Sequence, residues 1–169
     1  VLAGSAKPLV RPARSASNIH GKSGLGASLD LYARGTPSDK NGADFIIEMA
    51  RKYTGKLEIL SLGPLTDVAL ALEKAPEIAN AIACVTVMGG GIHAGNATRY
   101  AEFNIVADPE AASVVFSSGV KTVMIGLDAT NLCYQPRSDI ELLRAPTELG
   151  KIVPAMLSSY ADVYRQVHN

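Results

Sequence analysis

Three short apolar runs constrain the fold of this chain most strongly. Each is rich in β-branched residues or leucine and ends at a glycine or a polar turn; they cover residues 57–62, 82–88 and 121–127. Continuous apolar runs of this length are typical of strands that are covered on both faces, as in parallel sheets. Residues 1–3 could form the end of a fourth strand.

Segments with helical patterns separate these runs. The predicted helices cover residues 41–52, 64–74, 108–119, 138–144 and 147–166. The sequence Asp108-Pro109-Glu110 is a strong helix start, because Asp can accept hydrogen bonds from free backbone amides and Pro fits the first turn. Gly119 suits the end of the same helix. The alternation predicts an α/β fold with an open, mostly parallel sheet and helices on both faces.

Composition excludes several classes of protein. The 16 basic and 16 acidic side chains give a net charge of zero, which argues against nucleic-acid and acidic-membrane partners. No apolar run approaches the ~20 residues that a membrane helix needs, and the first residues lack the pattern of a signal peptide. Cys84 and Cys133 have no metal-ligand spacing, so we expect reduced, mostly buried thiols in a cytoplasmic protein. By length alone, residues 1–169 form one domain.

Polar side chains gather after the second apolar run. In open α/β sheets the chemistry lies beyond the carboxyl ends of the strands. A glycine-rich loop follows residue 88 there and leads to Asn96, Glu102 and Asn104. The loop matches no phosphate-binding pattern and could be a plain mobile loop. Amides and a carboxylate, however, pair naturally with the vicinal hydroxyls of a sugar.

Other candidate residues have competing interpretations. His20 sits in a glycine-flanked loop, where a site role and a structural role are about equally supported. Asp108 is better explained as a helix cap than as a catalytic carboxylate. Asp128 follows a strand and could cap a helix, bond to a loop or contact a ligand. His93 has no visible partner, which favours a surface or loop role.

Several strings together resemble one family, the inosine–uridine-preferring nucleoside hydrolases. They are IHGKSGLG, LSLGPLTDVALAL, VTVMGGGIHAGNATRYAEFNIVADPEAASVVFSSG and VMIGLDAT, and VLAGSAKPLV resembles the strand that leads into the family's substrate loop. The family's DxDxGxDD cluster and its later His-Asp pair are absent here. The resemblance therefore implies that residues 1–169 are the middle section of a larger nucleoside hydrolase domain.

The resemblance also implies roles for single residues. His20 would reach the nucleobase side of the pocket, and Met88 would lie under the ribose. Asn96, Glu102 and Asn104 would hold the ribose hydroxyls. The main-chain carbonyl of Leu62 would bind calcium, for which a carbonyl oxygen is a suitable ligand.

The implied activity is calcium-assisted hydrolysis of the N-glycosidic bond of ribonucleosides, by a homodimer or homotetramer. The alternative is a non-catalytic remnant with a structural or weak ribose-binding role, since the family's base and most of its calcium ligands lie outside the matched strings. Purine-specific relatives place a bulky aromatic residue where this chain has Gly21. That difference favours a broader or pyrimidine-tolerant specificity, and leaves the base preference open.

Overall fold

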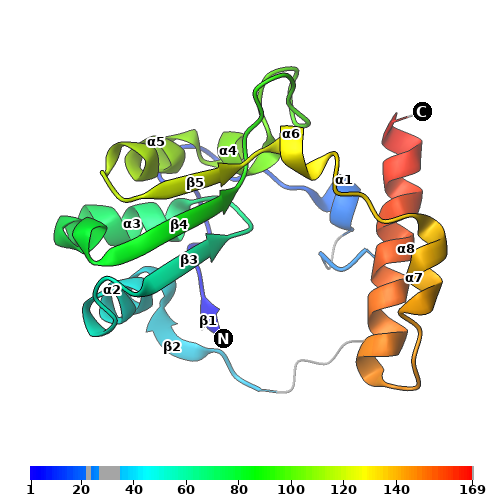
Figure 1. Cartoon of the computed structure of the whole chain (residues 1–169), viewed down its shortest axis with the longest axis horizontal. Helices are drawn as coiled ribbons and strands as arrows, with labels where there is room; N and C mark the ends of the chain where they lie inside the picture. The colour runs from blue at the N-terminus through cyan, green and yellow to red at the C-terminus, as the bar shows by residue number, and fades with distance from the viewer. Residues whose placement is uncertain (22–23, 27–34, 169) are drawn as a thin grey trace. The chain divides into compact units, whose positions relative to one another are not determined.

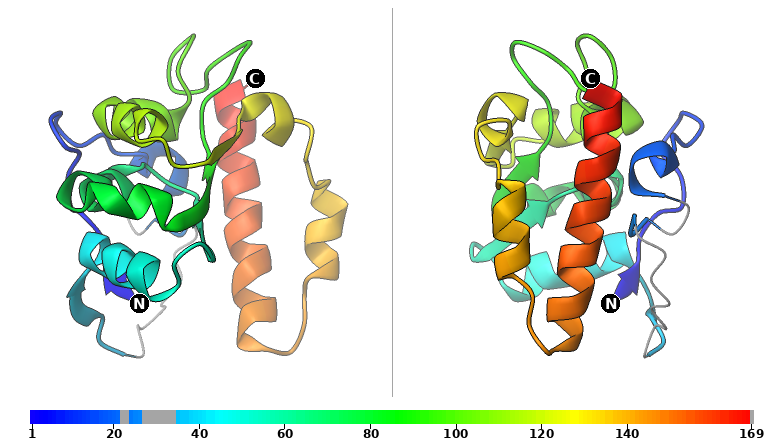
Figure 2. Two further views of the ribbon diagram at one scale, coloured as in Figure 1. Left: turned by 60° about the vertical axis from the view of Figure 1, so that its left-hand side comes forward. Right: turned by 90° about the vertical axis from the view of Figure 1, so that its right-hand side faces the viewer.

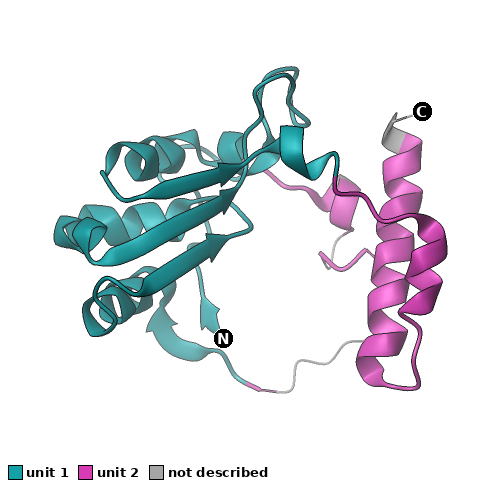
Figure 3. Cartoon of the chain, viewed as in Figure 1, with its two compact units in different colours: residues 1–13, 36–132 teal, residues 14–35, 133–169 magenta. Residues whose placement is uncertain are grey.

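The structure, a computed structural model, describes residues 1–21, 24–26 and 35–168. The chain divides into two compact units, shown in Figure 3. Unit one comprises residues 1–13 and 36–132, and unit two comprises residues 14–35 and 133–169. Each unit is described separately below.

A three-stranded parallel sheet forms the centre of unit one. Its order is β3 (Leu57–Ser61), β4 (Ile82–Met88) and β5 (Thr122–Ile125). All three apolar runs are therefore strands, as the sequence predicts. The first strand ends one residue early and the third is shorter at both ends, because Leu127 instead begins the short helix α6 (Leu127–Thr130).

A separate two-stranded parallel sheet pairs β1 (Leu2–Ala3) with β2 (Ser38–Asn41). The suggested strand at the start of the chain is thus present. The second strand was not predicted, because its Ser-Asp-Lys-Asn sequence is polar and exposed throughout and carries no alternation of apolar residues.

Helices α2 (Gly42–Lys52), α3 (Thr66–Lys74) and α5 (Pro109–Ser117) lie side by side along one face of the larger sheet (Figure 1). The 3₁₀-helix η1 (Pro76–Asn80) connects α3 to β4. The core lies between these helices and the sheet, and it includes Val85, Val115 and Ile78, which are fully buried. The α/β class and the open parallel sheet are confirmed.

The opposite face of this sheet carries exposed apolar side chains. Leu60, Val123 and Ile125 are exposed there. We expected helices on both faces of the sheet. The helices α2, α3 and α5 of unit one cover a single face.

Capping residues hold the helix ends of unit one. The Asn41 side chain accepts hydrogen bonds from the amides of Ala43 and Asp44 at the start of α2. Asp108 caps α5 by accepting from the amide of Ala111 over 3.0 Å, as predicted. Gly119 follows α5 with φ of 82°, in the left-handed region that glycine adopts without strain.

Unit two contains α1 (Ser17–His20), α7 (Arg137–Leu142) and α8 (Glu148–His168). Helices α7 and α8 run side by side (Figure 2), and Arg137 forms an ion pair with Asp162 over 2.5 Å. Both predicted C-terminal helices are confirmed, with ends shifted by one or two residues. None of the helices in the described part of the chain combines the length and apolar character that crossing a membrane requires.

The two cysteines are free thiols. Cys84 lies half-buried on β4, whereas Cys133 is exposed. The expectation of mostly buried thiols is therefore wrong for Cys133, which follows the last helix of unit one rather than lying within a strand.

Candidate functional site

Asn104 brings three of the predicted residues into contact. It lies in the first turn of α4 (Phe103–Ala107), a short helix that the sequence analysis did not predict. Its Nδ2 atom donates to the carbonyl of Met88 over 3.0 Å, and is 3.4 Å from both the carbonyl of Leu62 and the sulfur of Met88. The helix α4 is thereby held against the carboxyl ends of β3 and β4, and the Asn104 Oδ1 atom accepts no hydrogen bond from the described residues.

Glu102 is the N-cap of α4 and is almost completely buried, with 3% of its surface exposed. Its Oε2 atom accepts hydrogen bonds from the amides of Ile105, at 3.2 Å, and Gly90, at 3.1 Å. These bonds compensate for burial of a carboxylate. The other oxygen, Oε1, accepts none from the residues that the structure describes.

Asn96 completes this group at the far end of the glycine-rich loop. Its Oδ1 atom accepts a hydrogen bond from the amide of Phe103 over 2.9 Å, so that the side chain is fixed beside the start of α4. Its backbone amide donates to the carbonyl of Ala101 over 3.2 Å. The loop extends beyond the carboxyl end of β4, as Figure 1 shows.

The sequence left three roles open for Asp128: capping a helix, bonding to a loop or contacting a ligand. Its carboxylate bonds to the glycine-rich loop, accepting from the amides of Ile92, at 2.6 Å, and His93, at 3.2 Å. The Nδ1 atom of His93 lies 2.7 Å from Asp128 Oδ1. The bonds from Ile92 and His93 lower the pKa of Asp128 to about 2. His93 therefore has a partner, which its sequence surroundings did not reveal.

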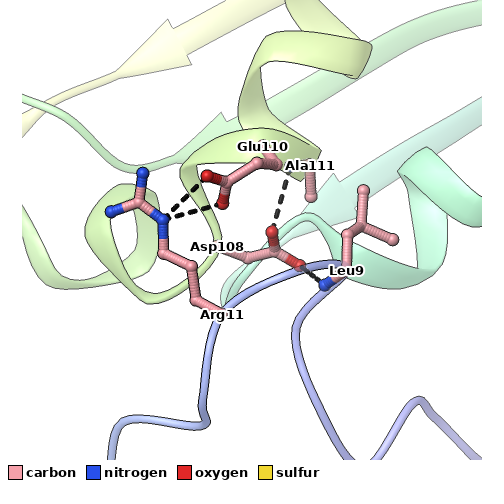
Figure 4. A network of polar contacts seen from close by, with 5 residues as sticks. All are labelled: Leu9, Arg11, Asp108, Glu110 and Ala111. Atoms are coloured by element: carbon pink, nitrogen blue, oxygen red, sulfur yellow. Dashed lines mark hydrogen bonds and ion pairs between the residues drawn. The ribbon is translucent and has the colours of Figure 1, made fainter.

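Asp108 does more than cap a helix. It is fully buried, and its Oδ2 atom accepts hydrogen bonds from the amide of Leu9 over 3.0 Å and from the hydroxyl of Thr66 over 2.7 Å. Nearby, Arg11 forms an ion pair with Glu110 over 2.8 Å (Figure 4). The segment after β1 is thus anchored to the start of α5. The sequence analysis missed this, because Leu9 and Asp108 are 99 positions apart.

His20 belongs to unit two, whereas the residues described above belong to unit one. It is the last residue of α1, rather than a loop residue as expected, and Gly21 follows it with φ of 70°. Its ring stacks on that of Tyr160 with centroids 5.6 Å apart and planes within 8°. Burial, and then Tyr164, raise the pKa of Tyr160. Nothing in the sequence near His20 indicated this aromatic partner.

The described residues contain no cluster of three or more His, Cys, Asp or Glu that could hold a metal ion. The predicted ligand, the carbonyl of Leu62, immediately follows β3 and accepts from Asn104. A carbonyl oxygen retains a second lone pair for a cation. Calcium takes six to eight oxygen ligands, and the Leu62 carbonyl would be one of them.

Comparisons with known proteins identify the family of this chain. The sequence model of the inosine-uridine preferring nucleoside hydrolases matches residues 1–169. The pyrimidine-specific ribonucleoside hydrolase RihA of Salmonella newport (strain SL254) is 38% identical over 168 residues, which are 99% of this chain and 53% of that protein. The RihA protein of Salmonella typhimurium is 37% identical over the same shares.

Two solved structures are similar to this one. The purine-preferring ribonucleoside hydrolase from Gardnerella vaginalis superimposes with a TM-score of 0.93 at 31% identity, covering 99% of this chain and 55% of that one. A plant nucleoside hydrolase, the PpNRh1 enzyme, gives a TM-score of 0.91 at 31% identity, covering 98% and 53%. The chain spans about half the length of these relatives. It belongs to the inosine–uridine preferring nucleoside hydrolase family.

Proposed function

We propose that the protein hydrolyses the N-glycosidic bond of ribonucleosides, and that residues of unit one hold the ribose. One observation carries the proposal: Asn96, Glu102 and Asn104 are fixed together beside Met88 at the carboxyl ends of β3 and β4. This edge of a parallel sheet is where ligands bind in open α/β folds. The relatives named above are nucleoside hydrolases, and this chain matches about half of their length.

The unused atoms of these three side chains match the needs of a sugar. Each side chain has one polar atom that makes no hydrogen bond with the described residues. These atoms are two acceptors, Glu102 Oε1 and Asn104 Oδ1, and one donor, Asn96 Nδ2. A ribose hydroxyl both donates and accepts. Vicinal hydroxyls can therefore be held by a mixed set of this kind, in which each side chain is already oriented by its other atoms.

The same group can favour bond cleavage. Departure of the nucleobase builds positive, oxocarbenium-like charge on the ribose. The buried carboxylate of Glu102 would stabilise that charge, and it is held in place before the reaction by the amides of Gly90 and Ile105. Holding the sugar in one orientation would also lower the entropic part of the activation free energy.

We also propose calcium as the cofactor, with the carbonyl of Leu62 as one ligand. Bound calcium would orient the ribose hydroxyls and acidify the attacking water. The remaining ligands would come from substrate, water and residues beyond those described here. His20 is proposed to face the nucleobase, stacked on Tyr160. Gly21, where purine-specific relatives place a bulky aromatic residue, favours a broader or pyrimidine-tolerant specificity. We further propose that the protein is a cytoplasmic homo-oligomer. Gel filtration with light scattering measures the number of its subunits.

Turnover by the full-length polypeptide tests this function. Inosine, uridine and cytidine are supplied, and Glu102→Ala is compared with wild type and with Glu77→Ala. Glu77 is an exposed carboxylate on η1 that pairs with Arg51, so it serves as the matched control. We expect kcat/KM to fall on the order of 10²–10³-fold in Glu102→Ala alone, as for loss of a transition-state contact. Equal values in all three proteins would refute the role of Glu102, and no turnover by wild type would favour a non-catalytic remnant.

A further inference from the structure

The contact between Asp128 and the glycine-rich loop has no part in the function proposed so far. Asp128 lies in α6, directly after β5, whereas Ile92 and His93 lie in the loop that follows the neighbouring strand β4. Three contacts join them: the two backbone amides at 2.6 and 3.2 Å, and the His93 ring at 2.7 Å. Hydrogen bonds from backbone amides to a carboxylate are strengthened by its charge.

Gly90, at the start of the glycine-rich loop, is held by two further hydrogen bonds of its backbone. The carbonyl of Gly90 accepts from the amide of Leu127 over 2.8 Å, and the amide of Gly90 donates to Glu102 over 3.1 Å. Gly90 adopts φ of 75°, and a Cβ at Gly126 would lie only 3.0 Å from the Gly90 oxygen. The backbone segments after β4 and β5 therefore approach closely, and Gly90 connects that contact directly to Glu102.

The rest of the loop is held by its own hydrogen bonds. The amide of Gly95 donates to the carbonyl of Arg99 over 3.0 Å, and those of Asn96 and Ala97 donate to Ala101. Loss of the Asp128 contacts would leave these bonds in place. The loop would keep its attachments at Gly90 and Asn96 but would lose the contacts that hold its middle, at Ile92 and His93.

We propose that Asp128 is a positioning residue for the ribose site: it holds the glycine-rich loop so that Asn96 and Glu102 keep the geometry needed to bind the sugar hydroxyls. The inference rests on the proposed function and deepens it. Asp128 acts through the loop and does not itself touch the substrate. His93 has a lesser share, because its side chain is 85% exposed and adds one contact to two that the backbone already makes.

The test measures discrimination, which does not depend on how much of each variant is folded. For the full-length enzyme, kcat/KM is determined for uridine, 2′-deoxyuridine and 3′-deoxyuridine, and the ratio of uridine to each deoxy analogue is compared between variants. Asp128→Ala removes every contact, Asp128→Asn retains one acceptor oxygen, and His93→Ala removes only the ring. Ser118→Ala is the matched control, because Ser118 bonds to the backbone of Val115 and Val120 at the opposite end of β5.

We expect at least one ratio to fall about tenfold in Asp128→Ala, as small displacements of binding groups have large effects on rate. Asp128→Asn should lie between that value and wild type, His93→Ala should change less, and Ser118→Ala should leave both ratios as they are. Unchanged ratios in both Asp128 variants, with Glu102→Ala still impaired, would overturn this inference and leave the proposed function standing. A wild-type enzyme that hydrolyses no ribonucleoside would overturn both.

Discussion

The Nδ2 atom of Asn104 donates a hydrogen bond to the main-chain carbonyl of Met88 over 3.0 Å. This bond ties the first turn of α4 to the end of β4, and the same nitrogen lies 3.4 Å from the carbonyl of Leu62 at the end of β3. A single side chain thus holds two strand ends and a helix start together. Its other polar atom, Oδ1, makes no hydrogen bond with the described residues.

Replacement of Asn104 by Asp tests that arrangement. Aspartate is nearly the same size, but it cannot donate, and its charge would face the carbonyl oxygens of Met88 and Leu62. We expect transition-state stabilisation to fall by about 1–3 kcal/mol, the cost of leaving a polar group without its partner. Asn80→Asp, at an exposed position on η1, is the control. Steady-state kinetics with uridine measures the effect, and equal kcat/KM in both variants would contradict the role of Asn104.

Substitutions of Gly95 and Gly119 distinguish an effect on the shape of the glycine-rich loop from an effect on overall stability. A Cβ at Gly95 would lie 2.3–2.4 Å from backbone atoms of Ala101 and Thr98, so Gly95→Ala must displace the loop. Gly119 has open space around it but a φ of 82°. Gly119→Ala should therefore cost about 1–2 kcal/mol of stability with kcat/KM retained, whereas Gly95→Ala should lose kcat/KM. Thermal denaturation and kinetics measure the two effects, and an active Gly95→Ala would show that the loop's shape does not matter.

Features carried by local sequence were predictable. The three strands of the larger sheet, the cap at Asp108 and the helices α7 and α8 follow from apolar runs and capping residues that lie next to one another in the chain. The strand β2 and the helix α4 were missed. One is polar throughout, and the other is only five residues long and is preceded by a glutamate as its cap.

Long-range partners were beyond the sequence. Asp108 with Leu9, Asp128 with His93, and His20 with Tyr160 are each joined by the fold, and no spacing rule relates them. The individual site residues were proposed from the family resemblance. The polar cluster after β4 was predicted from its place beyond the carboxyl end of a strand. The roles of these residues toward a substrate stay predictions.

The acid titration of Asp128 provides a test that needs no substrate. Its pKa is lowered from 3.8 to about 2 by the amide of Ile92 and then by His93. Because the folded pKa lies below the unfolded one, the contact contributes its full stability above about pH 4 and loses it as the pH falls toward 2. The amide NMR signals of Ile92 and His93 should titrate with a midpoint near 2, and not at all in Asp128→Asn. A midpoint at the ordinary value of an aspartate would show that the contact is absent in solution.

Ile78 reports on the packing of the core of unit one. It is fully buried in η1 and belongs to the core of unit one. Ile78→Ala should lower the free energy of unfolding by about 2–5 kcal/mol, and Ile78→Val by about 0.5–1.5 kcal/mol, because each deletes buried methyl groups and leaves a cavity. Urea denaturation measures both. Equal, small losses would mean that this site is not packed as the structure shows.

Release of free base and free ribose is the direct measure of the proposed ribonucleoside hydrolysis. Uridine is incubated with the full-length protein and calcium in phosphate-free buffer, and free uracil and free ribose are quantified over time. We predict that both products appear at equal rates, that the rate does not depend on added phosphate, and that Glu102→Ala abolishes most of it. No release of base, or release only when phosphate is present, would contradict the account.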